Sequence, residues 1–364
     1  MHATLLYLLY GNGRRYQDEL SYSVMSALRH AGGGDPGFRI LLACDAQSRR
    51  DDLPVENWIL SPQQMHDWTF GGSYPHALKL FVIAQALRRQ GGLVCLADTD
   101  TDFHASPQGI FAMISDQTSV MQADEGPIGA SPAWQPLIAA GAAADPSDLL
   151  SEVLAGDMRM LNSGIVGVGQ VHLQPVLAAA DLARRLHAIE PVFNIEQFAL
   201  GAMLQRHGEV RVTGSMVTHY WGYRKHIYHR RIPGALARIG HDYSPAAAAR
   251  LPQVTAPKKP LMARIAARLA PGLRQVDSAY RFAWLCRACC LRARDPVDRG
   301  IWAATALHML RQSRTTGHAR RDFRAFLPEN MPKLQLDAEN RTAWECFWQH
   351  HAAAGTGSFE TDRN

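Results

Sequence analysis

The chain has 364 residues, of which 47% are hydrophobic and 20% charged, with six cysteines and a net charge of +5 at pH 7. This is the composition of an ordinary soluble globular protein, long enough for two domains or for one large domain with an appendage. No apolar run approaches the roughly 18 residues of a membrane-spanning helix, and the N-terminus lacks the basic region and cleavage site of a signal peptide. We expect a cytoplasmic protein with reduced thiols; a metal site at Cys286, Cys289 and Cys290 is the alternative.

The first hundred residues alternate between short apolar runs and longer amphipathic stretches. The apolar runs predict buried strands at residues 3–10, 38–45 and 92–97. The amphipathic stretches predict helices at residues 18–34 and 76–92. Strands that alternate with helices in this way form right-handed crossovers, so we predict an α/β fold with a mostly parallel sheet flanked by helices.

Polar side chains follow each of these strands. Tyr10 and Asp45 end the first two, and the third runs into Asp98, Asp100 and Asp102. In a parallel sheet the carboxyl ends of the strands meet at one edge, where ligands bind. Carboxylates this close repel one another, and a divalent cation relieves the repulsion because hard cations prefer carboxylate oxygens. The alternative is an acidic loop in which an aspartate caps a helix.

Two later segments also place polar residues in regular structure. Residues 160–169 predict a strand that is interrupted by Asn162-Ser163-Gly164, although buried polar groups need partners. Residues 195–208 predict a helix with Glu196 and Gln197 in its first turn. For Asn162 the alternative is a β-bulge or turn, and for the helix start it is the ordinary preference of helix N-termini for acids.

The segment 217–231 gathers His219, several aromatic rings, Gly222 and Lys225. A histidine among aromatic rings can also be a residue at the rim of the core, which is the alternative for His219. We expect His226 and His229 to lie on the surface. We expect Asp102 to support its loop rather than to bind a metal.

The C-terminal third is strongly basic. Residues 250–324 contain 16 Lys or Arg against 4 Asp or Glu, which indicates a surface that meets phosphates. Within 258–274 an apolar stripe of Leu261, Ile265 and Leu269 beside basic residues predicts a helix that binds anionic membranes. Packing against the catalytic domain is the alternative. Nucleic-acid binding is disfavoured because no base-stacking platform of aromatic residues is evident.

Taken together, five of these segments resemble the GT-A-fold nucleotide-sugar glycosyltransferases, and most closely family 8, which includes glycogenin and bacterial lipopolysaccharide galactosyltransferases. They follow one another in the order of the family's motifs: Lys79-Leu80, Asp98-Thr99-Asp100, Asn162-Ser163-Gly164, Glu196-Gln197 and His219-Tyr220-Trp221-Gly222-Tyr223-Arg224-Lys225. These match a basic residue before Leu, the DXD motif, NxG, DQ and HFxGxxK. The chain departs from the family in having glutamate in DQ and in lacking the Pro-Trp that usually follows the lysine.

The resemblance spans residues 3–230 and implies the GT-A form of the α/β fold. It implies a metal-dependent hexosyltransferase, with a UDP-sugar as the expected donor and a glycan or lipid-linked acceptor, that acts in polysaccharide biosynthesis with retention of configuration. We therefore predict a nucleotide-sugar-binding catalytic domain at 1–235. Residues 236–364 would form a helical, basic region for the acceptor or for association with the inner face of the membrane.

The chemistry of a departing diphosphate suggests the role of each residue. A divalent cation neutralises the charge that builds up on the diphosphate, and Asp98, Asp100 and His219 would hold it. A nitrogen ligand beside carboxylates favours Mn²⁺ over Mg²⁺. Lys79 and Lys225 would bind the diphosphate as point charges.

The remaining candidates concern the sugar and the nucleoside. Gly222 would let the backbone approach the phosphates closely, and Asn162 would hydrogen-bond the donor sugar. The expected catalytic pair is Glu196, near sugar hydroxyls or a developing positive centre, and Gln197, which would face the anomeric carbon. The nucleoside is expected near Tyr10 and Asp45, and Thr99 of the DXD motif is expected among the residues that bind the nucleotide-sugar donor.

Two other functions remain open. Haloacid-dehalogenase-like, Mg²⁺-dependent phosphatases also carry Asp-x-Asp after an apolar strand, but normally after the first one, and they have Thr or Val at the position of Asp102. A catalytically silent, membrane-associated scaffold is the second alternative.

Overall fold

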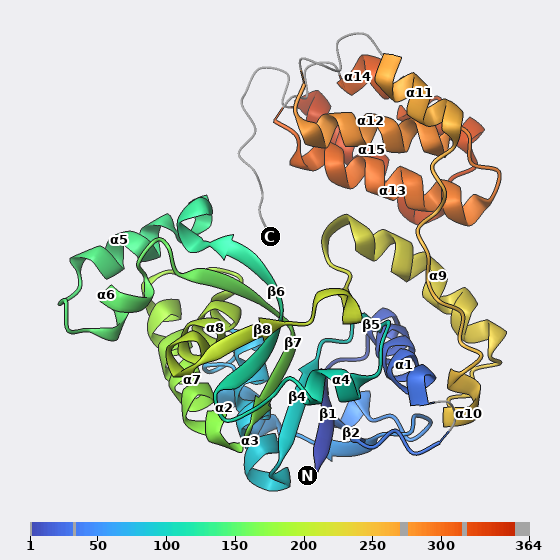
Figure 1. Cartoon of the computed structure of the whole chain (residues 1–364). Coiled ribbons are helices and arrows are strands. Elements are labelled where there is room, and N and C mark those ends of the chain that lie inside the picture. Colours follow the sequence, from blue (N-terminus) through green and yellow to red (C-terminus); the bar gives the residue numbers. More distant parts are fainter. Residues whose placement is uncertain (1, 32–33, 270–275, 315–318, 354–364) are drawn as a thin grey trace. The chain divides into compact units, whose positions relative to one another are not determined.

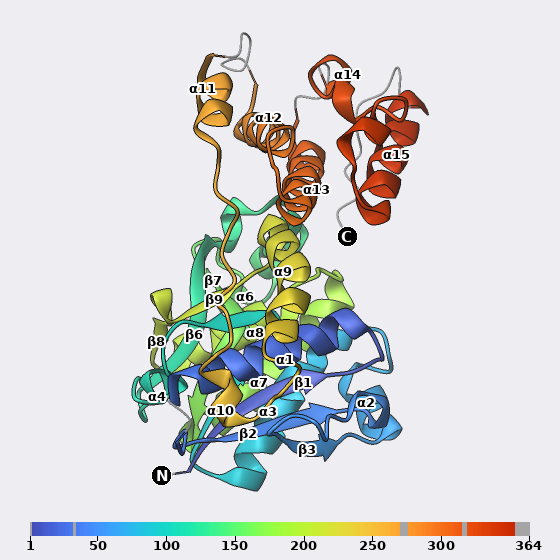
Figure 2. The same cartoon turned by 90° about the vertical axis from the view of Figure 1, so that its right-hand side faces the viewer.

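The computed structural model of the protein describes residues 2–31, 34–269, 276–314 and 319–353. The chain forms two compact units, which Figures 1 and 2 show in two orientations. The first unit comprises Met1–His219 and Leu236–Pro252, and the second comprises Tyr220–Ala235 and Gln253–Asn364. The domain boundary at residue 235 that we expect from the sequence remains a prediction.

The main sheet of the first unit has seven strands in the order β3-β2-β1-β4-β7-β6-β8. Their bounds are β1 Ala3–Leu9, β2 Arg39–Cys44, β3 Glu56–Ile59, β4 Leu93–Ala97, β6 Thr118–Pro127, β7 Arg159–Gly169 and β8 Glu209–Val212. Neighbouring strands are parallel except at β7, which runs antiparallel to β4 and β6. The predicted α/β fold with a mostly parallel sheet is therefore confirmed.

Helices cover both faces of this sheet (Figure 1). Those of the first unit are α1 Arg14–Leu28, α2 Pro62–Trp68, α3 Leu78–Gln90, α4 Pro107–Phe111, α5 Gln135–Ala143, α6 Leu149–Val153, α7 Leu173–Ile189, α8 Ile195–His207 and α10 Pro245–Ala248. Leu6 of β1 is buried in one core with residues of α3, α7 and α8. The adjacent Tyr7 reaches Ser23 of α1, with 3.0 Å between the hydroxyl oxygens. Because successive strand side chains point to opposite faces, α1 covers the other face.

The helices predicted in the first unit agree with the structure in kind, and only the first, which ends at Leu28, differs from its predicted bounds by more than two residues. The stripe expected in α3 is buried, since Leu80, Ile83 and Leu87 are all 0% exposed. The first helix begins at Arg14, four residues before its predicted start at Asp18. Glycines 32 and 33 of its predicted end lie outside the described residues.

A second, two-stranded sheet joins distant parts of the first unit. It pairs β5 (Thr101–Phe103), which follows the aspartate loop, antiparallel with β9 (Val217–His219). In this register Thr101 lies directly opposite His219. The pairing therefore places His219 beside the aspartates.

The second unit is helical. Its helices are α9 Lys225–Arg238, which ends in the first unit, and α11 Leu261–Leu269, α12 Ser278–Cys290, α13 Pro296–Gln312, α14 Ala319–Asp322 and α15 Ala338–Ala353. Its core contains Trp302, Trp344 and the thiols of Cys286, Cys289 and Cys290. These thiols are free and buried, as predicted.

Within the described ranges, none of the helices is both long and apolar enough to cross a membrane.

Candidate active site

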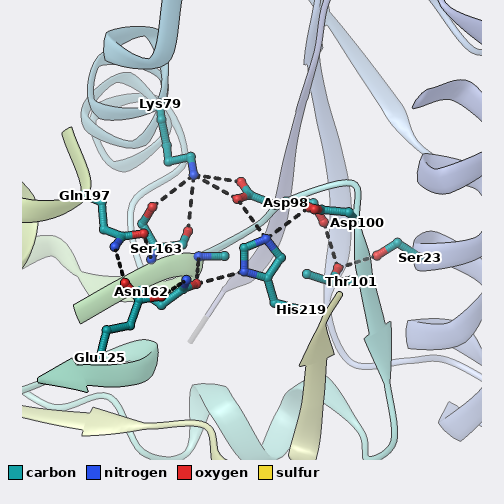
Figure 3. Close-up of polar contacts among 11 residues, drawn as sticks. Ser23, Lys79, Asp98, Asp100, Thr101, Glu125, Asn162, Ser163, Gln197 and His219 are labelled. Atoms are coloured by element: carbon teal, nitrogen blue, oxygen red, sulfur yellow. Dashed lines mark hydrogen bonds and ion pairs between the residues drawn. The ribbon is translucent and has the colours of Figure 1, made fainter. Parts of the chain in front are cut away.

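Three of the predicted residues form a compact cluster at the carboxyl edge of the main sheet. One ligand atom from each of Asp98, Asp100 and His219 lies within 4.8 Å of the other two. Asp98 directly follows β4, Asp100 lies in the turn before β5, and His219 ends β9. Figure 3 shows the three side chains turned toward one another. In the described part of the chain this is the one group of three or more acids, histidines and cysteines arranged as metal ligands.

Buried hydroxyl groups of Thr101 and Ser23 fix the loop that carries Asp98 and Asp100. The Thr101 hydroxyl donates to the backbone oxygen of Asp98 at 2.7 Å and lies 2.7 Å from the hydroxyl of Ser23 in α1. The backbone N–H of Asp98 donates to Gly164 O at 2.9 Å. The loop is thus fixed to α1 on one side and to β7 on the other.

Each of the three aspartates has a basic partner. Lys79 Nζ lies 2.9 Å from Asp98, His219 Nε2 lies 3.2 Å from Asp100 Oδ1, and Arg29 lies 3.4 Å from Asp102 Oδ1. The repulsion that we expected from the sequence is therefore balanced within the chain. The case for a cation rests on the geometry of the ligand atoms rather than on uncompensated charge.

The pKa values of Lys79, His219 and Asp100 are shifted by burial and by these neighbours. Burial alone would lower the pKa of Lys79 and of His219, but the neighbouring carboxylates of Asp98 and Asp100 outweigh it and raise both pKa values. Burial would raise the pKa of Asp100, yet the hydrogen bond with His219 lowers it. Lys79, His219 and Asp100 therefore favour their charged forms, and a cation would have to replace the charge of His219.

The ring of His219 is held from two sides. Its Nδ1 lies 2.8 Å from Asn162 Oδ1, which also accepts from the backbone N–H of Gly164 at 2.9 Å. A Cβ added at Gly164 would come within 2.3 Å of His219 Nδ1. The position therefore requires glycine because the imidazole occupies the space of a side chain.

The residues present fit a divalent metal ion. Two carboxylates and an imidazole form a mixed oxygen and nitrogen donor set. Opposite ligands of an ion with metal–oxygen distances of about 2.1 Å lie about 4.2 Å apart. The cluster, at 4.8 Å or less, would need to close only slightly around such an ion.

A network of amides and a carboxylate lies beside the cluster. Asn162 and Gln197 donate to the two carboxylate oxygens of Glu125 at 2.7 and 3.0 Å. Gln197 Oε1 accepts from the backbone N–H of Ser163 at 3.1 Å. Because β7 runs antiparallel to β4, its residues 162–164 extend past the end of β4 and reach the aspartate loop. The polar step in this strand thus has partners.

Glu196 is engaged by an aromatic residue. It is 5% exposed and accepts a hydrogen bond from the hydroxyl of Tyr74. The same hydroxyl lies 2.8 Å from the backbone oxygen of Phe193. Burial and the charge of Glu196 raise the pKa of Tyr74, so the phenol stays a donor.

The residues predicted for the nucleoside lie at the same edge of the sheet. Asp45 accepts from the backbone N–H groups of Gly11 and Ser48, both at 2.8 Å. Burial would raise the pKa of Asp45, but these hydrogen bonds lower it. Tyr10 is 38% exposed; burial and the charge of Glu196 raise its pKa against the opposing effect of Lys79. Thr99 lies in the turn between β4 and β5.

Two other predictions concern residues away from this cluster. Asp102 is 0% exposed and bonds to Tyr22 at 3.4 Å and to Arg29, so it supports the loop as expected. Gly222 and Lys225 belong to the second unit, where Gly222 adopts a φ of +63° and Lys225 begins α9. Their proposed contact with a diphosphate remains a prediction.

Sequence analysis missed Glu125 and Tyr74. Glu125 lies in the irregular half of β6, where the pairing with β7 shifts register. Tyr74 follows a glycine pair in the loop after α2. Neither residue belongs to a motif, and only the pairing of β6 with β7 and the packing of the α2 loop against α8 reveal them.

Comparison with known proteins gives matches among solved structures. No protein-family model and no curated protein sequence matches the chain. Mouse xyloside xylosyltransferase 1 in its apo form matches with 10% identity and a TM-score of 0.40, over 64% of this chain and 92% of that one. The galactosyltransferase LgtC, in complex with donor and acceptor sugar analogues, matches with 11% identity and a TM-score of 0.45, over 69% of this chain and 97% of that one. Both proteins are glycosyltransferases by name.

Proposed function

We propose that the protein is a metal-dependent GT-A glycosyltransferase that moves a hexose from a UDP-sugar to a glycan or lipid-linked acceptor. The observation that carries this proposal is the cluster of Asp98, Asp100 and His219 at the carboxyl edge of the sheet. Lys79 on one side and the amide network on the other supply groups for the two halves of such a donor.

Asp98, Asp100 and His219 would hold the cation, and Mn²⁺ is favoured over Mg²⁺ because one ligand is nitrogen. The ion supplies charge neutralisation for the departing diphosphate. Lys79 already reaches both Asp98 and Ser163, so its ammonium is positioned for a phosphate oxygen near the cluster. Gly222 and Lys225 are the further residues proposed to contact the diphosphate.

The donor sugar would lie against the amide network. Asn162, Gln197 and the exposed carboxylate of Glu125 offer both hydrogen-bond donors and acceptors, which sugar hydroxyls require. Gln197 is an amide and cannot deprotonate an acceptor, so it would lie beneath the anomeric carbon in a retaining transfer. Glu196, held by Tyr74, would place a negative charge near the developing positive centre. Tyr10 and Asp45 would contact the nucleoside, and Thr99 would bind the donor within the DXD motif.

We also propose that the protein acts in polysaccharide biosynthesis in the cytoplasm, at the inner face of the membrane. The basic second unit and the exposed apolar side chains of α11 support this location.

A thermal-shift screen of UDP- and GDP-sugars, with and without Mn²⁺, tests the function. A ligand that binds only the folded protein must raise its melting temperature by mass action, so a UDP-sugar should do so only with the metal. Release of phosphate from simple monoesters would favour the phosphatase instead. Absence of any nucleotide-sugar effect in the wild type would reject the proposal and leave the scaffold.

A further inference from the structure

The first unit contains a cavity outside the metal cluster. It has a volume of about 550 Å³ and opens between the end of α2 and the end of α7. Its walls include His66, Asp67, Phe70, Ser73, Arg184 and His187. The walls therefore combine three basic side chains with a single acidic one.

Arg184 is positioned to receive an anion. Its guanidinium carbon lies 5.2 Å from the ring centroid of Phe70, and within the described residues it has no carboxylate partner. The adjacent Arg185 instead pairs with Asp148 at 2.7 Å. A guanidinium that is held by an aromatic ring and lacks a carboxylate offers its N–H groups to phosphate or carboxylate.

The other polar groups of the cavity agree with this preference. Asp67 accepts a hydrogen bond from Gln63 at 2.8 Å, and its single negative charge is outnumbered by the basic side chains of the walls. The Nδ1 atom of His187 is buried and has no hydrogen-bond partner in the described structure. In the tautomer with a proton on Nδ1 the imidazole is a donor, and an anion or a water molecule supplies the acceptor that this atom lacks.

The backbone that carries Phe70 is unusual. Phe70, Gly71 and Gly72 have φ values of +54°, +75° and +88°. A bulky residue rarely adopts such a conformation, and when it does the strain tends to occur at ligand sites. Phe70 keeps it while packing near Tyr74 and Phe81, with ring centroids at 6.1 and 6.5 Å.

One aromatic ring separates this cavity from the candidate catalytic pair. The ring of Tyr74 stacks on His187 at 5.0 Å, and its hydroxyl donates to Glu196. Tyr74 therefore links Glu196 of the catalytic pair to His187 in the wall of the cavity. We propose that this cavity binds an anionic group, a phosphate or a carboxylate, carried by the acceptor glycan. The anion site stands on the cavity alone, whereas its assignment to an acceptor rests on the proposed function.

Glucose 6-phosphate is a suitable probe for the full-length protein. NMR of ¹³C-labelled histidines would follow the imidazole signals of His66 and His187 during titration with glucose 6-phosphate, glucuronate, inorganic phosphate and glucose. The two anionic sugars should shift these signals. They should bind more tightly than inorganic phosphate and far more tightly than glucose. Arg184→Gln should weaken binding by about tenfold or more. The matched variant Arg185→Gln removes the same charge one residue away and should leave binding unchanged.

Unshifted His66 and His187 signals, or equal losses in the two arginine variants, would overturn the anion site. Inorganic phosphate that binds as tightly as the anionic sugars would overturn the assignment to an acceptor. Mn²⁺ and UDP are titrated separately, and Arg184→Gln should not alter their affinity. If the wild type binds glucose 6-phosphate but neither Mn²⁺ nor UDP, the proposed function is rejected and the anion site is not.

Discussion

At the scale of single residues, the three aspartates of 98–102 differ in what surrounds them. Asp98 and Asp100 are partly exposed, with side chains 24% and 31% accessible, and they face His219. Asp102 is 0% exposed and faces Arg29 under α1. The geometry separates two candidate metal ligands from one structural ion pair, in the way that was expected for Asp102.

Asp98→Asn and Asp100→Asn should therefore remove metal-dependent nucleotide binding and transfer, by about 100-fold or more, because each loses a proposed metal ligand. Calorimetric titration of Mn²⁺ and of UDP with Mn²⁺ measures the effect. Asp102→Asn is the contrasting variant: it should cost about 3 kcal/mol of stability, since Arg29 loses a buried partner. Wild-type Mn²⁺ affinity in the first two variants would reject the metal assignment.

Gly164→Ala should displace the imidazole of His219, because the new methyl group would lie 2.3 Å from Nδ1. We expect Mn²⁺ affinity to fall by about tenfold or more while the far-ultraviolet circular dichroism spectrum stays that of the wild type. Gly156→Ala is the matched control, since the nearest atom to its added Cβ is 3.9 Å away. Equal Mn²⁺ affinity in the two variants would show that the ring position does not matter.

At the scale of secondary structure, the sequence predicted those helices and strands that carry a recognisable local pattern. β1, β2, β4, α3 and α8 carry apolar runs or helical stripes long enough to recognise. β3 has four residues, and β6 turns polar in its second half, so neither has a clear period. The antiparallel direction of β7 and the pairing of β5 with β9 depend on long-range contacts that no local pattern contains.

The residues of the candidate active site divide in the same way, into those that a sequence motif predicts and those that only long-range contacts reveal. Motifs in fixed order predicted Asp98, Asp100, His219 and Asn162, and the structure brings these four together. Glu125 and Tyr74 join the site only through the pairing of β6 with β7 and the packing of the α2 loop against α8.

The helix α11 retains the apolar stripe that the sequence predicts. Leu261, Met262 and Leu269 are 66%, 61% and 75% exposed, and Ile265 is 38% exposed. Residues 270–274 of the predicted membrane-binding segment lie outside the described residues. The exposed stripe beside Lys258, Lys259, Arg264 and Arg268 favours an anionic bilayer as its partner.

We expect the protein to co-sediment with vesicles that contain phosphatidylglycerol and to be released by high salt. Leu261→Asn with Leu269→Asn should weaken this binding by about tenfold, because both apolar contacts are lost. Leu291→Asn, at an exposed leucine outside α11, is the control. Sedimentation that is independent of lipid charge and of salt would contradict the prediction.

At the scale of the whole molecule, the helical unit should make stability depend on pH. His226 was expected on the surface, but its Nε2 is buried without a hydrogen-bond partner in the described structure. Its ring lies 5.6 Å from that of His308. Burial, the charge of His308 and that of Lys225 lower the pKa of His226 to about 3, and burial also lowers the pKa of His308.

Between pH 6.5 and 3, His226 is therefore protonated in the unfolded chain but not in the folded one. The free energy of unfolding should fall as pH falls through this window because the unfolded state binds more protons. Chemical unfolding at a series of pH values measures this dependence. His226→Leu should flatten it, whereas substitution of the exposed His350 by Gln should not. Parallel pH profiles of the wild type and His226→Leu would refute the assignment.

The reaction as a whole should retain the configuration of the donor. Gln197 cannot act as a base, and Glu196 is buried against Tyr74. Proton NMR of the fresh product from an α-linked gluco- or galacto-configured donor should show an α-linkage. Glu125→Gln should slow transfer and leave the linkage unchanged, because its carboxylate supports Asn162 and Gln197. A β-linked product from the wild type would reject retention and direct attention to Glu125 as the base.

The pairing of Thr101 with His219 also has a consequence for how the protein is made. A ribosome that adds 5–20 residues each second needs roughly 6–24 s to proceed from Asp100 to His219. Throughout that interval the nascent chain has the two aspartates without the histidine that completes the cluster. A cation can therefore be captured by the full set of ligands only after β9 has emerged, late in the translation of the first unit.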